Sequence, residues 1–366
     1  MRYCTRCVMP DTKPDLRFDE EGVCSACRAY DRRVTVDWKA RGAEFLRLVA
    51  QHKTHPVYDC VVGSSGGKDS HAITIKAREL GLRPLVVTAS TDHLTDLGRR
   101  NLENLKEVGV DCVEFTPKPT VRRKLNRIAL EEVGDIEWPE HCAIFGLPIR
   151  IAHQFGIAIV LYGENSQDEY GGPEAAQQAV RLDKRWREEF GGLLGLRPKD
   201  LIGRDGIEAA DLWPYEYPDV EDVFGVFLGQ FFPWDGWQNA LVAQAHGFEL
   251  YPRLVEGSLS SYENLDNAIV GIHDYFKWLK FGFGRASDIA SLHIRRGRLA
   301  RGDAVNMVQR LEGRFPWSYL GVSLGAILGE IGMDLAAFRE VVDRFANPKL
   351  LKKSEDGEWR LREPIS

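Results

Sequence analysis

A glycine-rich segment near residue 66 combines residue types that bind anions. It reads Ser64-Ser65-Gly66-Gly67-Lys68-Asp69-Ser70 and follows an apolar run that ends at Val62. Paired glycines let backbone N–H groups turn inward, and the N-terminus of a following helix attracts negative charge. The segment is not a Walker A loop, because Gly63 stands one residue too close to Gly67 and Asp69 replaces the usual Ser or Thr. We expect a phosphate-binding loop of another kind; the alternative is a glycine turn with a solvated Lys-Asp pair.

Ser65 to Ser70 resembles the loop of the PP-loop ATP pyrophosphatases, which hold the β and γ phosphates and expose the α-phosphorus to attack. The resemblance implies ATP-dependent adenylation and not a kinase reaction. Lys68 is expected to neutralise charge that develops on pyrophosphate, and Asp69 to hold Mg²⁺ or to orient the loop. The expected ATP contacts are Ser64, Ser65, Gly66, Gly67, Lys68, Asp69, Ser70, Thr88 and Gly163.

Two Cys-x-x-Cys pairs lie near the N-terminus, Cys4 with Cys7 and Cys24 with Cys27, with sixteen residues between them. This spacing is typical of a four-thiolate zinc site. Four protein ligands fill all tetrahedral positions, so the spacing predicts a structural Zn²⁺ and not a catalytic one. The alternative is a set of redox-active or simply buried thiols. Cys60, Cys112 and Cys142 are isolated in sequence and are assigned no role.

An acidic segment follows the most apolar run, Ile157 to Leu161. It begins at Gly163-Glu164-Asn165 and ends at Gly171-Gly172. Open α/β sheets bind ligands at the carboxyl ends of their strands, so Glu164 and Glu169 are candidate catalytic acids. They would bind magnesium or accept a proton from a nucleophile. An acidic surface turn closed by two glycines would look similar.

Apolar runs alternate with amphipathic stretches from Val57 onward, which predicts an α/β fold with a doubly wound parallel sheet. The expected strands are 58–62, 84–89, 112–115 and 157–161. The expected helices are 68–80, 97–108, 121–132 and 145–155. After about residue 172 the strand pattern fades and helical stretches dominate.

The predicted domain order has five parts. Residues 1–30 form a zinc-ribbon-like module, and residues 31–55 a linking helix with Thr35 or Asp37 as its N-cap. Residues 56–172 form the ATP-binding domain. Residues 173–351 form a mainly helical extension that contributes to the substrate site, and residues 352–366 a charged, loosely ordered tail.

Composition excludes several classes of protein. Hydrophobic residues make up 44% of the 366 residues and charged residues 28%, as in globular proteins. The formal net charge of -6 disfavours a long nucleic acid as partner. The sequence shows no secretory segment and no apolar run long enough to cross a bilayer, so a cytoplasmic protein without membrane contact is expected.

A longer set of motifs resembles the N-acetyl sugar amidotransferase family, and the likeness covers nearly the whole chain in order. It includes the zinc-type cysteine pairs and fails only in the last dozen residues. The segments that carry it are Thr95–Leu105, Val121–Arg127, Trp138–His141 with Ile144 and Phe145, Gly163–Asn165, Glu169–Gly172, Tyr262–Asp266 and Trp278–Arg285.

The resemblance implies an ATP-dependent conversion of a sugar acetamido group to an acetamidino group. The substrate would be an N-acetyl sugar, nucleotide-linked or otherwise acidic, in LPS O-antigen or related surface glycan biosynthesis. Transfer of AMP to the amide oxygen makes a good leaving group, which ammonia then displaces. Ammonia would come from a separate glutaminase subunit and a cyclase-like partner, since Cys24 lacks the second glycine of a Gly-x-Cys-x-Gly nucleophile turn.

Several candidate substrate contacts each have a plainer alternative. Arg122 and Arg123 would bind a diphosphate, or lie on a solvated basic helix with Lys124 and Arg127. His141 would orient the amide, or be a core histidine. Tyr262 would stack on a sugar or base, or fill a core. Asn264 and Arg285 are candidates through the family motifs that contain them.

Two other functions compete with this interpretation. A tRNA-thiolating PP-loop enzyme would also carry zinc modules, but the predicted ATP domain contains no Cys-x-x-Cys pair for sulfur transfer. A non-catalytic zinc-binding scaffold would keep a degenerate nucleotide loop, yet no residue of this loop looks degenerate.

Overall fold

A six-stranded sheet forms the centre of the fold in the computed structural model, which describes residues 1–91, 93–182 and 184–365. Its spatial order is β3-β2-β1-β4-β6-β5. The strands are β1 (Cys60–Ser64), β2 (Pro84–Ala89), β3 (Asp111–Phe115), β4 (Ile159–Tyr162), β5 (Arg181–Leu182) and β6 (Phe224–Phe227). All neighbours pair in parallel except β5 with β6. The chain builds outward from β1 in both directions, so the predicted doubly wound, mostly parallel sheet is confirmed.

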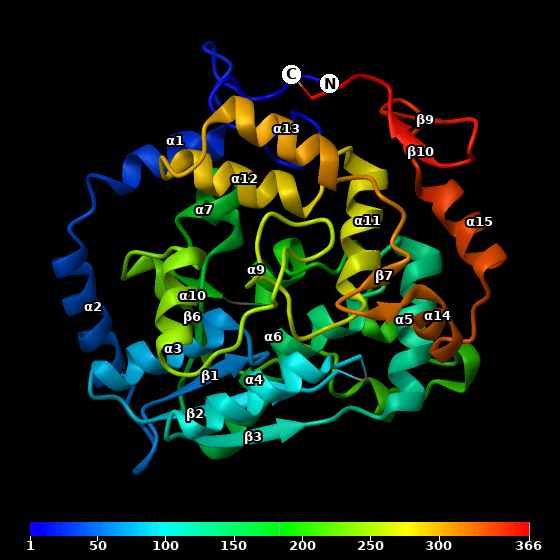
Figure 1. Cartoon of the computed structure of the whole chain (residues 1–366). Coiled ribbons are helices and arrows are strands. Elements are labelled where there is room, and N and C mark those ends of the chain that lie inside the picture. Colours follow the sequence, from blue (N-terminus) through cyan, green and yellow to red (C-terminus); the bar gives the residue numbers. More distant parts are fainter. Residues whose placement is uncertain (92, 183, 366) are drawn as a thin grey trace.

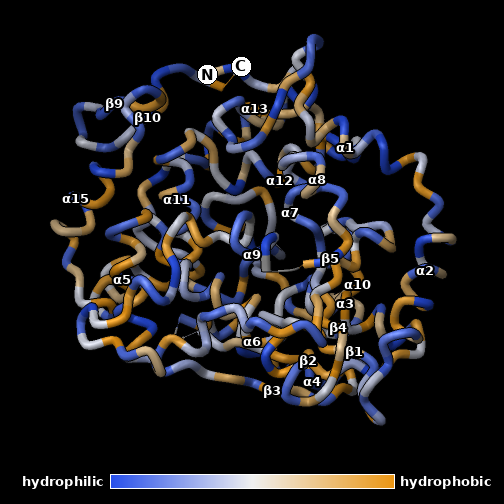
Figure 2. Tube along the Cα trace, turned by 180° about the vertical axis from the view of Figure 1, so that it is seen from behind, coloured by the Kyte–Doolittle hydropathy of each residue, from blue (hydrophilic) through white to orange (hydrophobic). Residues whose placement is uncertain are grey.

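Helices cover both faces of this sheet because alternate strand residues are apolar on each side. On one face Val62 and Val86 pack with residues such as Phe45 and Ile73. On the other, Val61 packs with residues such as Ile149. The covering helices are α2 (Trp38–Gln51), α3 (Lys68–Glu79) and α4 (Asp96–Glu107) on the first face, and α6 (Trp138–Phe155) on the second. In the hydropathy view, β1, β2 and β4 lie in a region rich in hydrophobic residues (Figure 2).

The sheet extends beyond the predicted boundary at residue 172. Strand β6 pairs in parallel with β4, from Ile159 with Phe224 to Tyr162 with Phe227, and β5 closes that edge. The predicted domain boundary at residue 172 therefore falls within the sheet, which takes two strands from the segment expected to be mainly helical. Four residues in a segment rich in glycine and aromatic residues give too short a pattern to predict a strand.

The C-terminal half is mainly helical, as expected. Its main core joins Ile272, Phe276 and Leu279 to Phe338 and Val342. The helices and short strands after β4 are α7 (Ser166–Tyr170), α8 (Glu174–Gln177), α9 (Lys184–Phe190), α10 (Gly236–Ala245), α11 (Val270–Phe281), α12 (Arg285–Arg295), α13 (Arg301–Leu311), β7 (Ser318–Tyr319), β8 (Val322–Ser323), α14 (Leu324–Glu330) and α15 (Leu335–Phe345). Between β3 and α6 lies α5 (Pro119–Val133).

The two ends of the chain meet on one side of the molecule (Figure 1). The amino group of Met1 lies 3.6 Å from Glu363, and Ile365 shares a buried cluster with Val8. The expectation of a loosely ordered tail from residue 352 is wrong, since β9 (Leu351–Lys353) and β10 (Trp359–Leu361) form a hairpin. Its first residue, Leu351, is fully buried. The charged side chains of this segment lie on the solvent face of that hairpin.

Of the two predicted N-caps of the linking helix, Asp37 is the one that caps α2. The Asp37 carboxylate accepts a hydrogen bond from the backbone N–H of Ala40 at 3.0 Å. Ahead of it, α1 (Ser25–Arg33) leads out of the cysteine module. Within the described ranges, no helix combines the length and the hydropathy that a membrane span needs.

Candidate active site

The glycine-rich loop connects the carboxyl end of β1 to the first turn of α3. Gly66 has φ +80°, and a Cβ atom there would lie 3.1 Å from Leu102 of α4, so both backbone conformation and space require glycine. Hydroxyl groups of the loop accept from its own backbone: Ser70 from Ser65 N, and Ser64 from Gly66 N. The first N–H groups of an α-helix have no intrahelical acceptor, so the loop and the start of α3 offer donors that could hold an anion.

Lys68 is buried and lies between two carboxylates. Its ammonium group contacts Asp69 and lies 2.9 Å from Glu263, whose segment belongs to the C-terminal half. Burial opposes protonation, but the charges of Asp69 and Glu263 outweigh it and hold the pKa of Lys68 well above its usual range. Asn239 of α10 donates to the other carboxylate oxygen of Asp69 at 2.8 Å. The predicted pair therefore has two partners that the sequence did not point to, Glu263 and Asn239.

Two further carboxyl groups lie near the loop, Glu164 and Asp266. Burial and the charge of Asp69 raise the pKa of Glu164 to about 7. Burial also raises the pKa of Asp266 to about 6, although a hydrogen bond from Ser65 lowers it. With Asp69 and Glu263 they form an acidic set that would repel a triphosphate unless a cation lay between them. Oxygen ligands of this kind are those that Mg²⁺ prefers, so the residues present fit magnesium-bound ATP.

Helix α4 holds Asp266 against the loop. The Thr95 hydroxyl donates to the carbonyl of Leu265, and the Thr95 backbone N–H donates to that of Asp266 at 3.0 Å. Gly98 permits this contact, because a Cβ there would lie 2.5 Å from Asp266 Cα. Asp266 was not predicted as a site residue, although it is the last residue of Tyr262–Asp266, one of the motifs that carry the family resemblance.

A cavity of about 220 Å³ opens beside the loop at the carboxyl edge of the sheet. The structure brings five of the predicted site residues together in its wall: Ser65, Thr88, His141, Asn264 and Arg285. Residues that were not predicted also line it, among them Glu137, Glu140, Asp266 and His273. A neighbouring cavity of about 260 Å³ lies among the C-terminal helices, and Arg285 lines both. Only the first touches the loop, so it is the candidate active site.

Arg285 is fixed in the cavity wall by residues of the C-terminal half. Its guanidinium donates to both carboxylate oxygens of Asp274, at 3.0 and 3.2 Å. The Asn264 amide, with its oxygen turned toward the guanidinium, accepts from Arg285 at 3.0 Å. Asn264 adopts φ +52°, a conformation that asparagine tolerates better than most residues. Tyr262 lies nearer the loop, with its ring centroid 5.9 Å from Lys68 Nζ and its hydroxyl 3.2 Å from His293.

The predicted basic face of α5 does not exist as one surface. Arg122 is buried and donates to the carbonyl of Ser90, behind the cavity wall. Lys124 donates to the carbonyl of Asp205, and Arg127 pairs with Glu131. Arg123 is half-buried and is not among the described residues that line the cavity. A helix turns about 100° per residue, so Arg122 and Arg123 point in different directions, and a diphosphate contact by either residue stays a prediction.

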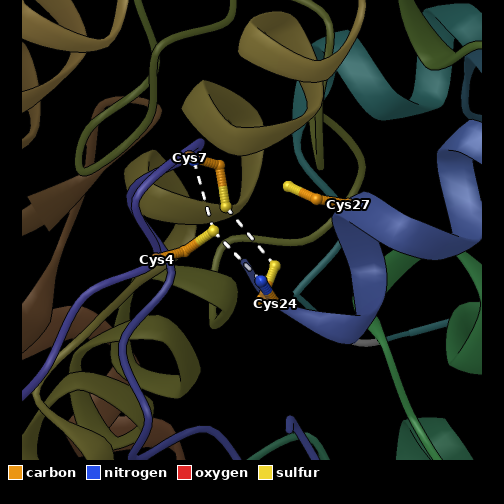
Figure 3. A group of neighbouring side chains, drawn as sticks. All are labelled: Cys4, Cys7, Cys24 and Cys27. Carbon is orange, nitrogen blue, oxygen red and sulfur yellow. Dashed lines mark hydrogen bonds between the residues drawn. The ribbon is translucent and has the colours of Figure 1, made fainter. Parts of the chain in front are cut away.

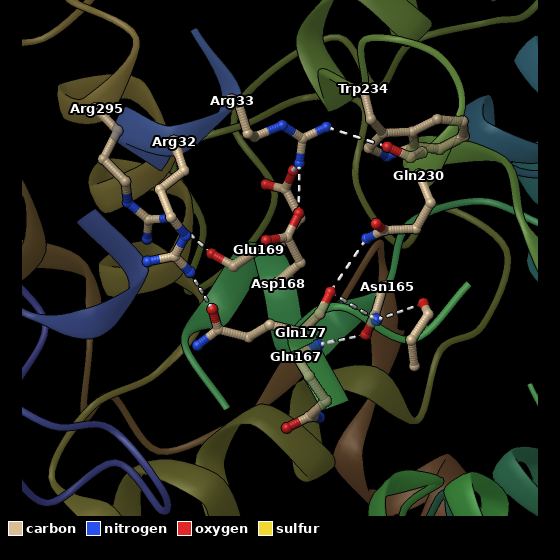
Figure 4. A network of polar contacts seen from close by, with 12 residues as sticks. Arg32, Arg33, Asn165, Gln167, Asp168, Glu169, Gln177, Gln230, Trp234 and Arg295 are labelled. Atoms are coloured by element: carbon tan, nitrogen blue, oxygen red, sulfur yellow. Dashed lines mark hydrogen bonds and ion pairs between the residues drawn. The ribbon is translucent and has the colours of Figure 1, made fainter. Parts of the chain in front are cut away.

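Glu169 lies in a buried network that ties α7 to α1 and α12 (Figure 4). Its carboxylate lies 3.0 Å from Arg33 and 3.2 Å from Arg296, and its backbone carbonyl accepts from Arg295. These contacts give Glu169 a structural task, and the catalytic role expected for it stays a prediction. Packing also explains the glycine at position 163, because a Cβ there would lie 2.7 Å from the Trp234 ring.

The four N-terminal cysteines converge, as predicted (Figure 3). All four are fully buried, and their sulfur atoms lie within 4.8 Å of one another. Cys7 Sγ and Cys24 Sγ are 3.7 Å apart, close to the ~3.8 Å that two thiolates span across a tetrahedral zinc with ~2.3 Å bonds. Backbone N–H groups of Arg6, Cys7 and Cys24 point at Cys4 Sγ. The donor set therefore fits Zn²⁺.

The fold and the site define an α/β protein with a mostly parallel sheet, a polar cavity at its carboxyl edge and a separate four-cysteine cluster. Residues 256–365 match the family model described as LPS biosynthesis protein WbpG-like, C-terminal domain. The resemblance to a polysaccharide biosynthesis family is thereby confirmed for that part.

No curated protein sequence matches the chain. Among solved structures, the NMN synthetase from Francisella tularensis is similar at 17% sequence identity and a TM-score of 0.30. The match covers 49% of this chain and 78% of that one. A similarity at this score does not define the fold, which rests on the strand order described above.

Proposed function

We propose that the protein is an ATP-dependent amidotransferase that converts the acetamido group of an N-acetyl sugar into an acetamidino group. The amide oxygen attacks the α-phosphorus of ATP, the bond between the α and β phosphates breaks, and pyrophosphate leaves. Ammonia then forms a bond to the imidate carbon, the carbon–oxygen bond to AMP breaks, and a proton is released. The products are the amidine, AMP and pyrophosphate, and the sugar would belong to LPS O-antigen or a related surface glycan.

The observation that carries this proposal is the composition of the cavity wall. Ser65 of the anion-binding loop faces the same space as Asn264, Asp266 and Arg285. The last three belong to the part of the chain that matches a family of LPS biosynthesis proteins. A loop residue of the proposed phosphate site and residues of the matched segment thus line one cavity, which supports a reaction between ATP and a sugar.

Different loop residues would act in the first step, the attack of the amide oxygen on the α-phosphorus. The backbone of Gly66 and Gly67 and the start of α3 would hold the outer phosphates, and Lys68 would neutralise the leaving pyrophosphate. Asp69, with Glu164 in reach of its charge, would hold Mg²⁺. The divalent ion supplies charge neutralisation, and Thr88 lies in the cavity wall where the rest of the nucleotide fits.

The chain itself offers no reactive thiol to release ammonia from glutamine. Four of its seven cysteines form the buried cluster, and Cys60 is also fully buried. Burial raises the pKa of Cys142 to about 12 and raises that of Cys112 above its usual range. A separate glutaminase, with a cyclase-like partner, would therefore supply the ammonia. Free ammonium salt at high concentration should replace both.

The test is a reaction of the full-length protein with ATP, magnesium, ammonium chloride and candidate acetamido sugars with and without a nucleotide. Mass spectrometry should find replacement of oxygen by NH, with AMP and pyrophosphate formed in equal amounts. Lys68→Ala and Asp69→Asn should abolish both products without unfolding the protein. Lys76→Ala is the matched control, because this lysine lies on the same helix with an exposed side chain paired to Glu79. Formation of ADP and phosphate in place of AMP would contradict the proposal.

A further inference from the structure

Three side chains with metal-binding donor atoms meet in the cavity wall away from the glycine-rich loop. Glu137 immediately precedes α6, His141 lies one turn into that helix, and His273 lies at the start of α11. One ring nitrogen of each histidine and one carboxylate oxygen of Glu137 lie within 4.8 Å of one another. Residues four apart at a helix start share a face, and α11 adds its histidine from the C-terminal half.

A buried carboxylate, Asp135, lies behind the two imidazoles. One of its oxygens accepts a hydrogen bond from Nδ1 of His273 at 2.7 Å, and the other lies 3.4 Å from Nδ1 of His141 without a hydrogen bond between them. Asp135 is itself held by the backbone N–H of Glu137 at 3.0 Å. A carboxylate that accepts from one imidazole nitrogen fixes the ring and its tautomer and leaves the lone pair of the other nitrogen for a metal.

Glu137 is oriented in a similar way. Asn267 donates to one of its carboxylate oxygens at 3.1 Å, while the other lies 3.8 Å from His273 Nδ1. Glu137 is buried, whereas the two histidines keep 26% and 21% of their side-chain surface exposed. All three line the cavity of about 220 Å³ that also reaches Ser65 and Asp266. Contacts with Asp135 and Asn267 therefore hold the donor atoms from the protein side, and the cavity leaves them accessible from the other side.

We propose that Glu137, His141 and His273 bind a divalent metal ion of the zinc type, with Asp135 orienting the imidazole of His273. Two histidines and one carboxylate are a ligand set of open zinc sites, in which a water or a bound molecule completes the coordination. This site contrasts with the cysteine cluster, whose four thiolates leave no position free. An oxygen or nitrogen atom of a molecule in the cavity would reach the ion. Metal binding here does not depend on the amidotransferase reaction.

The test uses the full-length protein, stripped of metal and titrated with Zn²⁺ and separately with Co²⁺. The wild type should bind two equivalents. Cobalt in the cysteine cluster gives intense sulfur-to-metal charge-transfer absorption, whereas nitrogen and oxygen ligands give only weaker visible bands. His141→Gln and His273→Gln should each lose one equivalent and the weaker bands, and keep the thiolate absorption. Asp135→Asn should keep the second site with an affinity reduced about 10- to 100-fold.

The matched control is His153→Gln, since His153 lies on the same helix α6 but is exposed and pairs with Asp222 at 2.8 Å. It should bind two equivalents. Should one histidine variant fail to fold by circular dichroism, Glu137→Gln provides the same comparison. Two equivalents in the folded His141, His273 and Glu137 variants would overturn the proposal. A wild type that binds one equivalent, removed entirely by Cys27→Ser, would overturn it too.

Discussion

Single side chains around the loop differ in how their charge responds to pH, and two carboxyl groups, Glu164 and Asp266, have a pKa raised toward neutrality. Burial and the negative charge of Asp69 raise the pKa of Glu164 to about 7. The carboxyl group is therefore mostly neutral below that pH and ionised above it. A magnesium ligand or general base has to be ionised, so kcat/KM of the proposed reaction should rise as pH increases through about 7.

Replacement of Glu164 by glutamine checks this. Glu164→Gln should lower kcat/KM for ATP about 100-fold at pH 8 and remove the rise through about pH 7. The measurement is pyrophosphate release at saturating ammonium. Glu174→Gln, a change at an exposed acid on α8, should retain the wild-type profile. A rising limb that persists in the Glu164 variant would assign the titration to another group.

Residue types and local spacing predicted the parts of the site that are close in sequence. The loop from Ser64 to Ser70 and the four cysteines each form one local pattern, so both could be found without the fold. Glu263 and His273 could not, because they reach Lys68 and His141 only when the C-terminal half folds over the sheet. Neighbouring cations such as Arg122 and Arg123 diverge on a helix, so their proximity in sequence did not predict that Arg122 is buried.

At the level of elements, α7 is the short helix that carries Glu169 and follows the strand end with Glu164. Two arginines from distant segments, Arg33 of α1 and Arg296 directly after α12, converge on the Glu169 carboxylate in a buried site. Removal of one partner from a buried ion pair leaves uncompensated charge, which costs about 3–5 kcal/mol. This network therefore fixes where the acidic segment lies relative to the loop.

Glu169→Gln should lower the free energy of unfolding by about 3 kcal/mol, measured by urea denaturation. Glu189→Gln is the control, because Glu189 forms a solvent-exposed pair with Arg185 at 2.8 Å and such pairs contribute about 0–1 kcal/mol. Pyrophosphate release by the Glu169 variant, measured well below its unfolding temperature, should stay within about tenfold of wild type. A variant of wild-type stability without activity would return Glu169 to a catalytic role.

Elements whose pattern of apolar and polar residues extends over a whole strand or several helical turns were predicted well. Strand β2 has the predicted bounds, and α3 and α4 differ from prediction by a residue or so at their ends. Strand β6 was missed because its identity comes from pairing with β4, a contact between distant segments, and not from its four residues. The β9–β10 hairpin was missed because charged side chains on its solvent face hide the buried Leu351 and Ile365.

On the scale of the whole molecule, the cysteine module at the N-terminus contacts segments close to residue 300. Arg301 of α13 donates to the backbone carbonyls of Cys4 and Cys7, both at 3.1 Å, and Phe283 packs in the same cluster as the cysteines. The helix between these contacts, α12, carries Arg295 at its end and is followed by Arg296, and both arginines contact Glu169 of α7. Zinc at the four thiols would therefore stabilise the position of the acidic segment as well as residues 1–30.

Cys27→Ser should remove one equivalent of zinc and lower the free energy of unfolding by more than about 4 kcal/mol, because a structural metal is among the largest single contributions to stability. Cys112→Ser, a change at a half-buried cysteine outside the cluster, should keep the zinc content of wild type. Hydrogen exchange locates the effect: protection should fall in residues 1–33, in α7 and in α12, which share contacts with the module, while β1, β2 and β3 stay protected. Uniform loss of protection across the sheet would contradict a local role for the module, and unchanged protection in α7 and α12 would break the proposed link between the zinc site and the acidic segment.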